Sequence, residues 1–374
     1  MRQNPNLSES KPHYEILDGL RGVAALLVVL FHILEIHSHG DHSKQIINHG
    51  YLAVDFFFML SGYVVSYAYD GRWNQMSLKD FFKRRIIRLH PMIIIGMIIG
   101  AALFYFQASS GLGWRGINEV PIWKMLLVMV IGFTLIPVGK GLDIRGWNEM
   151  HPLNGPAWSL FYEYIANIVY AIFLRRISNI FLTVLVLIAA GVTMHYALTN
   201  PHGDIIGGWS IAPHQLRIGF TRLAFPFLAG MLLAKTAKLY YTKNAFLSAS
   251  LLLVLFMSVP RVGNSEQLWM NGAYECFCLM IVFPVIVWLG AGGKVKGNKA
   301  LKLCKFFGDI SYPIYITHFP IVYIYMAWVT NNNLTLAESW HVGILCTVIS
   351  IVVAYISMKL YDIPIREWLR KRFL

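Results

Sequence analysis

The chain has 374 residues, of which 56% are hydrophobic and 14% are charged. Soluble domains carry roughly a quarter charged residues, so this chain has too little polar surface for a soluble protein. Lys and Arg exceed Asp and Glu by 32 to 19. In a soluble chain that excess would suggest nucleic-acid binding, but here the basic residues gather in particular loops, as topology signals do. The composition therefore excludes a soluble enzyme, a disordered chain and a nucleic-acid-binding protein.

Apolar runs recur along the whole chain, and most approach the roughly 20 residues that a transmembrane helix needs. The runs lack the alternation of barrel strands, so we expect helices. In chain order they cover residues 20–36, 51–69, 91–107, 122–136, 155–174, 179–198, 217–235, 244–259, 272–290, 306–329 and 340–361. The predicted fold is all-α, a polytopic membrane helix bundle that forms one domain over residues 1–374.

The distribution of Lys and Arg predicts the topology. Basic residues concentrate in the loops 70–90, 175–178, 235–243 and 291–305 and in the tail Arg370-Lys371-Arg372, which the positive-inside rule places in the cytoplasm. Both termini then lie inside, and the number of crossings must be even. Of the eleven runs, 122–136 is short and bounded by Pro121 and Pro137. We therefore predict about ten transmembrane helices, with 122–136 re-entrant or interfacial.

The first apolar run contains two ionisable residues, Arg21 and His32. Ionisable residues inside a membrane span are costly and mark functional sites by default. Eleven residues make about three helical turns, so both side chains face one side of the helix, about 16 Å apart along its axis. The alternatives are an arginine that reaches the interface and a histidine that only packs.

The second apolar run carries Asp55 about one turn from its outer end, which is the depth of His32 in the first run. Two antiparallel neighbours would bring these side chains together. A carboxylate on one ring nitrogen leaves the other nitrogen free to act as a base. We expect Asp55 to orient His32, and the alternative is that Asp55 caps its own helix.

Three arginines in one loop, Arg84, Arg85 and Arg88, form a candidate phosphate site. Arg84 and Arg88 are i,i+4 neighbours on one helical face, and arginine binds phosphate through paired hydrogen bonds. The alternative is that these residues only mark the cytoplasmic side.

Three further polar residues lie within apolar runs. Glu163 lies near the outer end of its predicted helix, and Tyr315 and His318 lie on one face of theirs. Each is a candidate catalytic residue, although each alone could be a hydrogen-bonded packing residue.

Taken together, these residues resemble acyltransferase family 3, integral-membrane enzymes that acylate hydroxyls on cell-envelope carbohydrates. The resemblance extends from the Leu17–Gly22 stretch to Arg366, and its most specific element is the arginine-to-histidine spacing of Arg21 and His32. Other matches follow in order: Asp55-Phe-Phe-Phe with Ser61-Gly62-Tyr63, Arg84-Arg85 with Arg88, Trp158-Ser159-Leu160 with Glu163, and Ser311-Tyr312 with Tyr315 and His318. The family motif often ends in two adjacent acids, whereas Glu163 is followed here by Tyr164.

The resemblance implies an O-acyltransferase that uses acyl-CoA, with acetyl as the expected acyl group and no metal. The phosphates of CoA would bind Arg84, Arg85 and Arg88, and its arm would extend along Arg21. His32 would deprotonate an acceptor hydroxyl, while Tyr315, His318 or Arg222 stabilises the oxyanion. The chain leaves no room for the soluble esterase-like domain that some members append.

A transporter of an organic anion or a lipid-linked sugar would also explain charges inside the membrane, although no internal repeat is visible. The acceptor is expected to be a carbohydrate or a lipid-linked carbohydrate, and the oligomeric state stays open. We expect the protein in a bacterial cytoplasmic membrane. Outer-loop residues such as Trp147, Asn148, Trp209, His214 and Trp269 would suit sugar stacking, but we interpret them as an interfacial aromatic belt.

Overall fold

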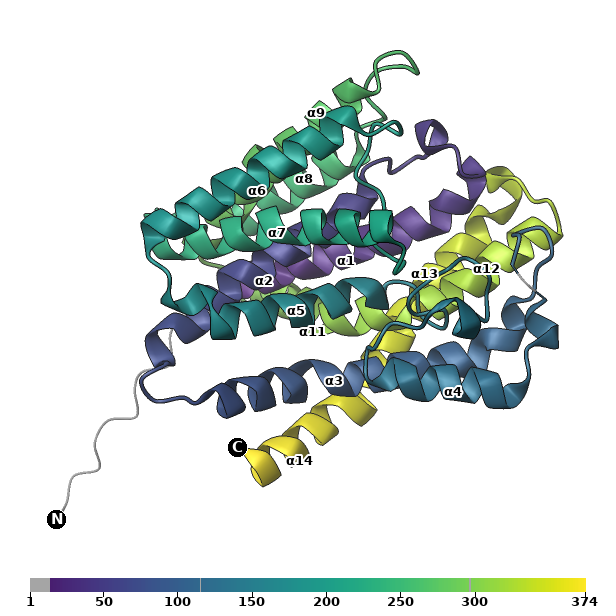
Figure 1. The fold of residues 1–374 in the computed structure, drawn as a ribbon, viewed down its shortest axis with the longest axis horizontal. Coiled ribbons are helices and arrows are strands. Elements are labelled where there is room, and N and C mark those ends of the chain that lie inside the picture. Colours follow the sequence, from purple (N-terminus) through teal and green to yellow (C-terminus); the bar gives the residue numbers. More distant parts are fainter. Residues whose placement is uncertain (1–13, 115, 296) are drawn as a thin grey trace.

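The computed structural model describes residues 14–114, 116–295 and 297–374 (Figure 1). Residues 1–13, Arg115 and Lys296, which entered the topology prediction, lie outside these ranges. Within the described ranges the chain is helical and forms no β-strand, which confirms the all-α class. The helices are α1 (Glu15–Glu35), α2 (Ala53–Tyr69), α3 (Leu78–Leu103), α4 (Ile122–Phe133), α5 (Ala157–Ile172), α6 (Asn179–Thr199), α7 (Pro213–Thr236), α8 (Ala245–Ser258), α9 (Trp269–Phe277), α10 (Phe283–Gly292), α11 (Asn298–Thr317), α12 (Phe319–Asn331), α13 (Leu336–Ser357) and α14 (Ile363–Phe373).

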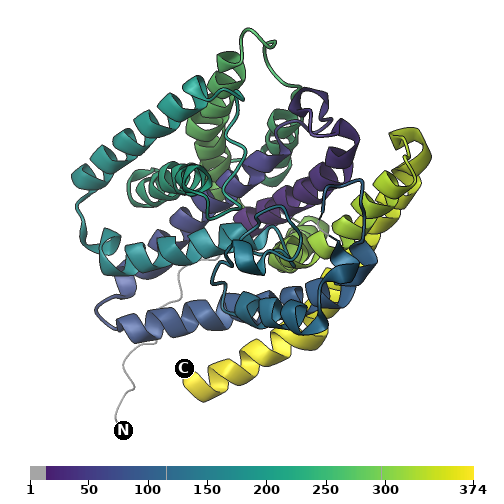
Figure 2. The same ribbon diagram turned by 45° about the vertical axis from the view of Figure 1, so that its right-hand side comes forward.

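Helices α1 and α2 lie at the centre of the bundle, and α6 and α13 lie at its margin (Figures 1 and 2). The apolar stretches of α1 and α2 are 67% and 72% buried, whereas those of α6 and α13 are only 22% and 33% buried. Large apolar side chains such as Ile180 and Leu187 are therefore exposed on α6. Helix faces that expose many apolar side chains suit contact with lipid.

Glycines allow the central helices to approach closely. A Cβ atom at Gly62 of α2 would lie 2.0 Å from the carbonyl oxygen of Phe227, and one at Gly230 of α7 would lie 2.1 Å from that of Met59. On α1, a Cβ at Gly22 would lie 2.2 Å from the carbonyl oxygen of Phe307 in α11. Small residues at helix contacts are typical of membrane bundles, so α2–α7 and α1–α11 are tightly packed pairs.

Eight helical segments among the described residues are long and apolar enough to cross a membrane, so the chain is an integral membrane protein. These segments are Glu15–Ser38, Gly50–Arg72, Leu78–Gln107, Ala157–Arg176, Asn179–Thr199, Pro213–Thr236, Trp269–Gly292 and Leu336–Phe373. The 14-residue α8 and the consecutive α11 and α12 would complete ten crossings. Helix α4 has 12 residues, or about 18 Å, which is less than the roughly 30 Å of the hydrocarbon core. The count of ten and the re-entrant α4 remain predictions.

A cysteine-labelling experiment tests the placement of α4. Ser110 and Gly141 are exposed residues on either side of this helix, and the four native cysteines are buried. If α4 does not cross, Ser110→Cys and Gly141→Cys should both react with an impermeant thiol reagent added outside. Lys79→Cys, in the basic 70–90 segment, is the control and should react only after permeabilisation. Labelling of the first two variants from opposite sides would establish an eleventh crossing.

The C-terminal helix returns to the beginning of α3. The Lys83 ammonium donates to the carbonyl oxygen of Phe373 at 3.1 Å, and Figure 1 shows this chain end on the same side of the bundle as the α2–α3 loop. The two basic segments that predict a cytoplasmic face are therefore neighbours in space.

Two π-helical turns, Cys278–Val282 and Met358–Asp362, each end two residues before a proline, Pro284 and Pro364. Proline removes a backbone donor and crowds the carbonyl one turn earlier. A wider i→i+5 turn accommodates that crowding without ending the helix. The second turn places Met358 and Asp362 on the wall of a cavity described below.

Candidate active site

Two cavities meet inside the bundle. The inner cavity, about 650 Å³, is named for the side that the basic segments predict to be cytoplasmic, and it is lined by the first turns of α1, the first half of α3 and the start of α14. The outer cavity, about 730 Å³, is lined by the end of α1 and the loop that follows it. Val54 and Tyr315 line both cavities, so these two side chains lie at the boundary.

His32 lines the outer cavity and pairs with a carboxylate of its own helix. Its Nδ1 lies 2.7 Å from Oε2 of Glu35. Since a carboxylate oxygen accepts, Nδ1 donates, and in the neutral imidazole Nε2 then keeps its lone pair. The imidazole also stacks on the ring of His318, with centroids 5.7 Å apart and planes at 26°. His32 is therefore held in the tautomer that a general base requires.

Asp55 does not orient His32, so that prediction is wrong. Its carboxylate is fully buried and pairs with Arg222 of α7, whose Nη2 lies 2.6 Å from Oδ2. The same guanidinium donates to the carbonyl oxygens of Gly207 and Tyr51. Asp55 lies in the first turn of α2, close to the predicted helix end, but its side chain faces α7 instead of the histidine. Arg222 lines the outer cavity, but all three of its nitrogens already donate to protein oxygens, so it is a weaker candidate for the oxyanion than a free donor.

Glu163 lies on the wall of the inner cavity, nearly two turns into α5 and not at its outer end. Arg85 donates to its Oε1 at 2.8 Å, and the Ser61 hydroxyl donates to the same oxygen at 3.0 Å. These bonds join α2, α3 and α5 around the cavity. The single acid of this motif therefore has a basic and a hydroxyl partner, and no second acid follows it.

Arg21, Arg85 and Arg88 line the inner cavity, whereas Arg84 is exposed and lines neither cavity. The predicted clamp of Arg84 and Arg88 thus presents only Arg88 to this space. Arg21 pairs with Asp18 at 2.9 Å, and Arg85 pairs with Glu163. Among the described residues, Arg88 has no carboxylate within ion-pair distance, unlike Arg21 and Arg85.

Tyr315 lies at the boundary between the two cavities. His318 lies behind this boundary and lines neither cavity. The Tyr315 hydroxyl lies 2.7 Å from the Ser159 hydroxyl, and both lie near the carbonyl oxygen of Pro156. His318 is fully buried, and its Nδ1 lies 2.9 Å from two carbonyl oxygens. That ring nitrogen must donate, so Nε2 is bare and cannot donate to an oxyanion. His318 supports the His32 ring instead of lining either cavity.

A model of a known protein family, described as an acyltransferase domain, matches residues 14–359. The chain belongs to acyltransferase family 3. Membership agrees with the residue pattern and decides in favour of a membrane acyltransferase over the transporter.

Relatives of this family member include protein 2 of the picA locus of Rhizobium radiobacter, 33% identical over 51% of this chain and 98% of that protein. A putative O-acetyltransferase of Staphylococcus aureus is 23% identical over 94% of this chain. The O-acetyltransferase OatA of that species is 22% identical over the same share. This chain spans 57% of the length of both staphylococcal proteins. No solved structure matches it.

Several residues of this family member that line the cavities were not predicted from the sequence: Glu35, Glu149, Lys305, Asp362 and Arg366. Glu35 follows His32 by three residues, and that spacing places two side chains together on a helix. Asp362 and Arg366 form an ion pair at 3.2 Å. Asp362 ends the second π-helical turn and Arg366 lies one turn beyond it, and no apolar pattern reveals where that turn falls.

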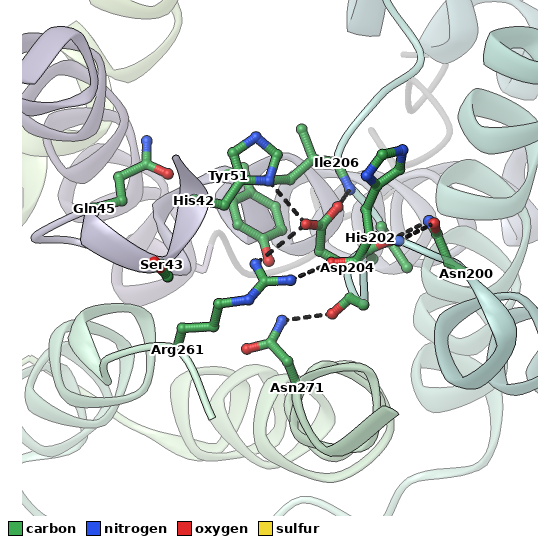
Figure 3. A network of polar contacts seen from close by, with 12 residues as sticks. His42, Ser43, Gln45, Tyr51, Asn200, His202, Asp204, Ile206, Arg261 and Asn271 are labelled. Atoms are coloured by element: carbon green, nitrogen blue, oxygen red, sulfur yellow. Dashed lines mark hydrogen bonds and ion pairs between the residues drawn. The ribbon is translucent and has the colours of Figure 1, made fainter. Parts of the chain in front are cut away.

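The loops at the outer end of this acyltransferase domain are joined by a polar network (Figure 3). Asp204 accepts from His42 at 2.9 Å and from Arg261 at 3.3 Å, which ties together three loops. The hydrogen bond to Asp204 raises the pKa of His42. Burial opposes the charge of Asp204, but its bond to His42 and the nearby positive charges outweigh burial and lower the pKa of this carboxyl.

We expect the outer loops to be most stable at mildly acidic pH. The raised pKa of His42 adds stability below about pH 6.5 that is lost as pH rises through the folded-state pKa. The lowered pKa of Asp204 adds stability above about pH 4 that is lost as pH falls. Proteolysis of the 36–50 loop, measured across pH, should be slowest between these values. His42→Gln should remove the loss on the alkaline side, and an unchanged profile would contradict the assignment.

Proposed function

We propose that the protein is an O-acyltransferase of a bacterial cytoplasmic membrane, with both termini in the cytoplasm. It would transfer an acyl group, expected to be acetyl, from cytoplasmic acyl-CoA to a hydroxyl of an envelope carbohydrate. The observation that carries this proposal is the pair of cavities that share Val54 and Tyr315. A donor in one cavity and an acceptor in the other would meet at this boundary. The names of the staphylococcal relatives support acetyl transfer.

The inner cavity suits the phosphates of CoA. Its lining holds five basic residues, Arg21, Arg85, Arg88, Lys305 and Arg366, together with five carboxylates, Glu15, Asp18, Glu163, Asp309 and Asp362. Among the described residues, Arg88 and Lys305 have no carboxylate within ion-pair distance, so their positive charges are available to a ligand. Phosphate bound there would form charge-assisted hydrogen bonds. The acyl end of the donor would then extend toward Tyr315.

In the outer cavity, His32 would act as the general base. The acceptor hydroxyl gives its proton to Nε2 of His32, and the hydroxyl oxygen bonds to the thioester carbonyl carbon. The tetrahedral intermediate then collapses, the carbon–sulfur bond breaks, and the departing CoA thiolate takes the proton from the imidazolium. Glu35 fills the orienting role that we had expected of Asp55, since it accepts the Nδ1 proton and stabilises the imidazolium.

The hydroxyls of Tyr315 and Ser159 are the best placed groups for the oxyanion. They lie 2.7 Å apart and share the Pro156 carbonyl oxygen as acceptor. Because that oxygen can be satisfied by one hydroxyl, the proton of the other can turn toward the intermediate. Donors directed at developing charge in a water-poor site are among the strongest catalytic contributions.

The direct test supplies the purified protein with radiolabelled acetyl-CoA and with glycans from the envelope of the source cell. We expect label in the glycan through an alkali-labile ester. If correctly folded protein shows neither transfer to the glycan nor thioester hydrolysis, that result contradicts the proposal.

A matched pair of variants tests the donor site. Arg88→Lys keeps the charge but loses the forked hydrogen-bond geometry of arginine, and one charge-assisted bond is worth roughly 1.5–3 kcal/mol. We expect acetyl-CoA to bind about 10-fold more weakly or weaker still, as measured by calorimetry. Arg84→Lys, on the same helical face but outside the inner cavity, is the control and should bind normally. Equal affinities in the two variants would remove Arg88 from the donor site.

A further inference from the structure

An open groove continues from the outer cavity across the outer surface of the protein. It has a volume of about 610 Å³ and lies between the α4–α5 loop and the first residues of α7. Trp147, Glu149 and Trp209 line both the outer cavity and this groove. The two spaces are therefore adjacent halves of one depression, with two tryptophans at their junction.

Backbone hydrogen bonds hold the walls of the groove in place. The Met150 N–H donates to the carbonyl oxygen of Trp209 at 2.8 Å, and the Val138 N–H donates to that of Met150 at 3.0 Å. The carboxylate of Asp143 accepts from the N–H groups of Arg145, Gly146 and Asn148. Because the α4–α5 loop is fixed both to itself and to the 200–212 loop, the groove exists before any ligand binds.

The side chains along the groove suit a sugar. Trp147 is anchored through its indole N–H to the carbonyl oxygen of Leu112, yet remains 37% exposed. Lys140, Asn148 and His214 are exposed on the groove and line it without lining the outer cavity. Aromatic faces beside polar hydrogen-bonding groups match the alternating C–H and O–H surfaces of a pyranose. Our expectation of an interfacial belt thus fits Trp269, which lines neither space, better than it fits Trp147 and Trp209.

We propose that the groove is a second acceptor subsite and that the acceptor is an oligosaccharide or polysaccharide of at least two linked sugar units. The unit that receives the acyl group occupies the outer cavity beside His32, and its neighbour occupies the groove. The junction tryptophans contact the glycosidic linkage between the two units. This inference rests on the proposed function and adds the length of the acceptor to it.

The test measures transfer from radiolabelled acetyl-CoA to envelope glycans cut and sorted into fragments of one, two, three and four units. We expect kcat/KM to rise at least about 10-fold from one unit to two, a change of about 1.4 kcal/mol in binding. The double variant Lys140→Ala, His214→Ala should abolish this gain by raising KM for the longer fragments, and should leave the single unit unaffected. Trp269→Ala, an exposed tryptophan outside both spaces, should behave as the unmodified protein.

Each other outcome has a definite meaning. Equal kcat/KM for one and two units, or a double variant that keeps the preference for longer fragments, would overturn the second subsite while the acyltransferase assignment stands. If no fragment of any length is labelled although the protein is folded and binds acetyl-CoA, the carbohydrate acceptor itself is wrong, and the subsite is rejected with it.

Discussion

We expect His32→Ala to lower the rate of acyl transfer by about 10²- to 10⁴-fold, the usual loss when a general base is removed. The side chain lines the outer cavity, and its Nδ1 is engaged by Glu35, so Nε2 is the nitrogen that can accept a proton. The measurement is kcat for acetyl transfer to envelope glycan. The affinity for acetyl-CoA should be unchanged, because the proposed donor phosphates lie in the other cavity.

Glu35→Gln is the informative companion to this variant. Glutamine keeps the size of the side chain but can donate as well as accept, so it no longer imposes one tautomer on His32. We expect a partial loss of kcat, smaller than that of His32→Ala, with little change in KM for the acceptor. Full activity in His32→Ala would remove the histidine from the mechanism, and full activity in Glu35→Gln would remove only its orienting partner.

The position of the apolar helices along the chain could largely be predicted from the sequence, because hydropathy reports directly which segments avoid water. The position of some polar residues along their helices was predictable for the same reason, since Arg21 and His32 do lie toward opposite ends of α1 in the inner and outer cavities. Glu163 is an exception, because it lines the inner cavity and does not lie at the outer end of α5. What hydropathy does not report is the rotation of one helix against another. Asp55 lies in the first turn of α2, close to the predicted helix end, yet its side chain faces α7.

The sequence analysis missed several side-chain partners for the same reason, because hydropathy does not report how helices are rotated against each other. The sequence places Arg222 within an apolar run, but only the α2–α7 contact shows that its guanidinium forms an ion pair with Asp55. The i,i+3 spacing of His32 and Glu35, in contrast, is a local signal that could have identified the orienting carboxylate. Arg84 and Arg88 share a helical face, but only Arg88 lines the inner cavity. Local spacing predicts neighbours within a helix, and tertiary contacts decide the rest.

The second large effect that we expect concerns stability. Asp55→Asn and Arg222→Met should each destabilise the folded protein strongly, by about 3–5 kcal/mol. Both side chains are almost completely buried, at 0% and 3% exposure, and removing one charge leaves the other buried without its partner. Arg222 also loses its bonds to the carbonyl oxygens of Gly207 and Tyr51 in the methionine variant. Thermal unfolding in detergent, followed by fluorescence, measures the loss.

The double variant Asp55→Leu, Arg222→Met separates a structural ion pair from a catalytic carboxylate. Replacing both buried charges by apolar side chains removes the penalty of the unpaired charge, so the double variant should be more stable than either single variant. It should also retain measurable acyl transfer, because Glu35 and not Asp55 contacts His32. If instead Asp55→Asn folds with normal stability but has lost kcat, the carboxylate acts on the reaction itself. The pairing of His32 with Glu35 would then be insufficient to explain how His32 acts as the general base.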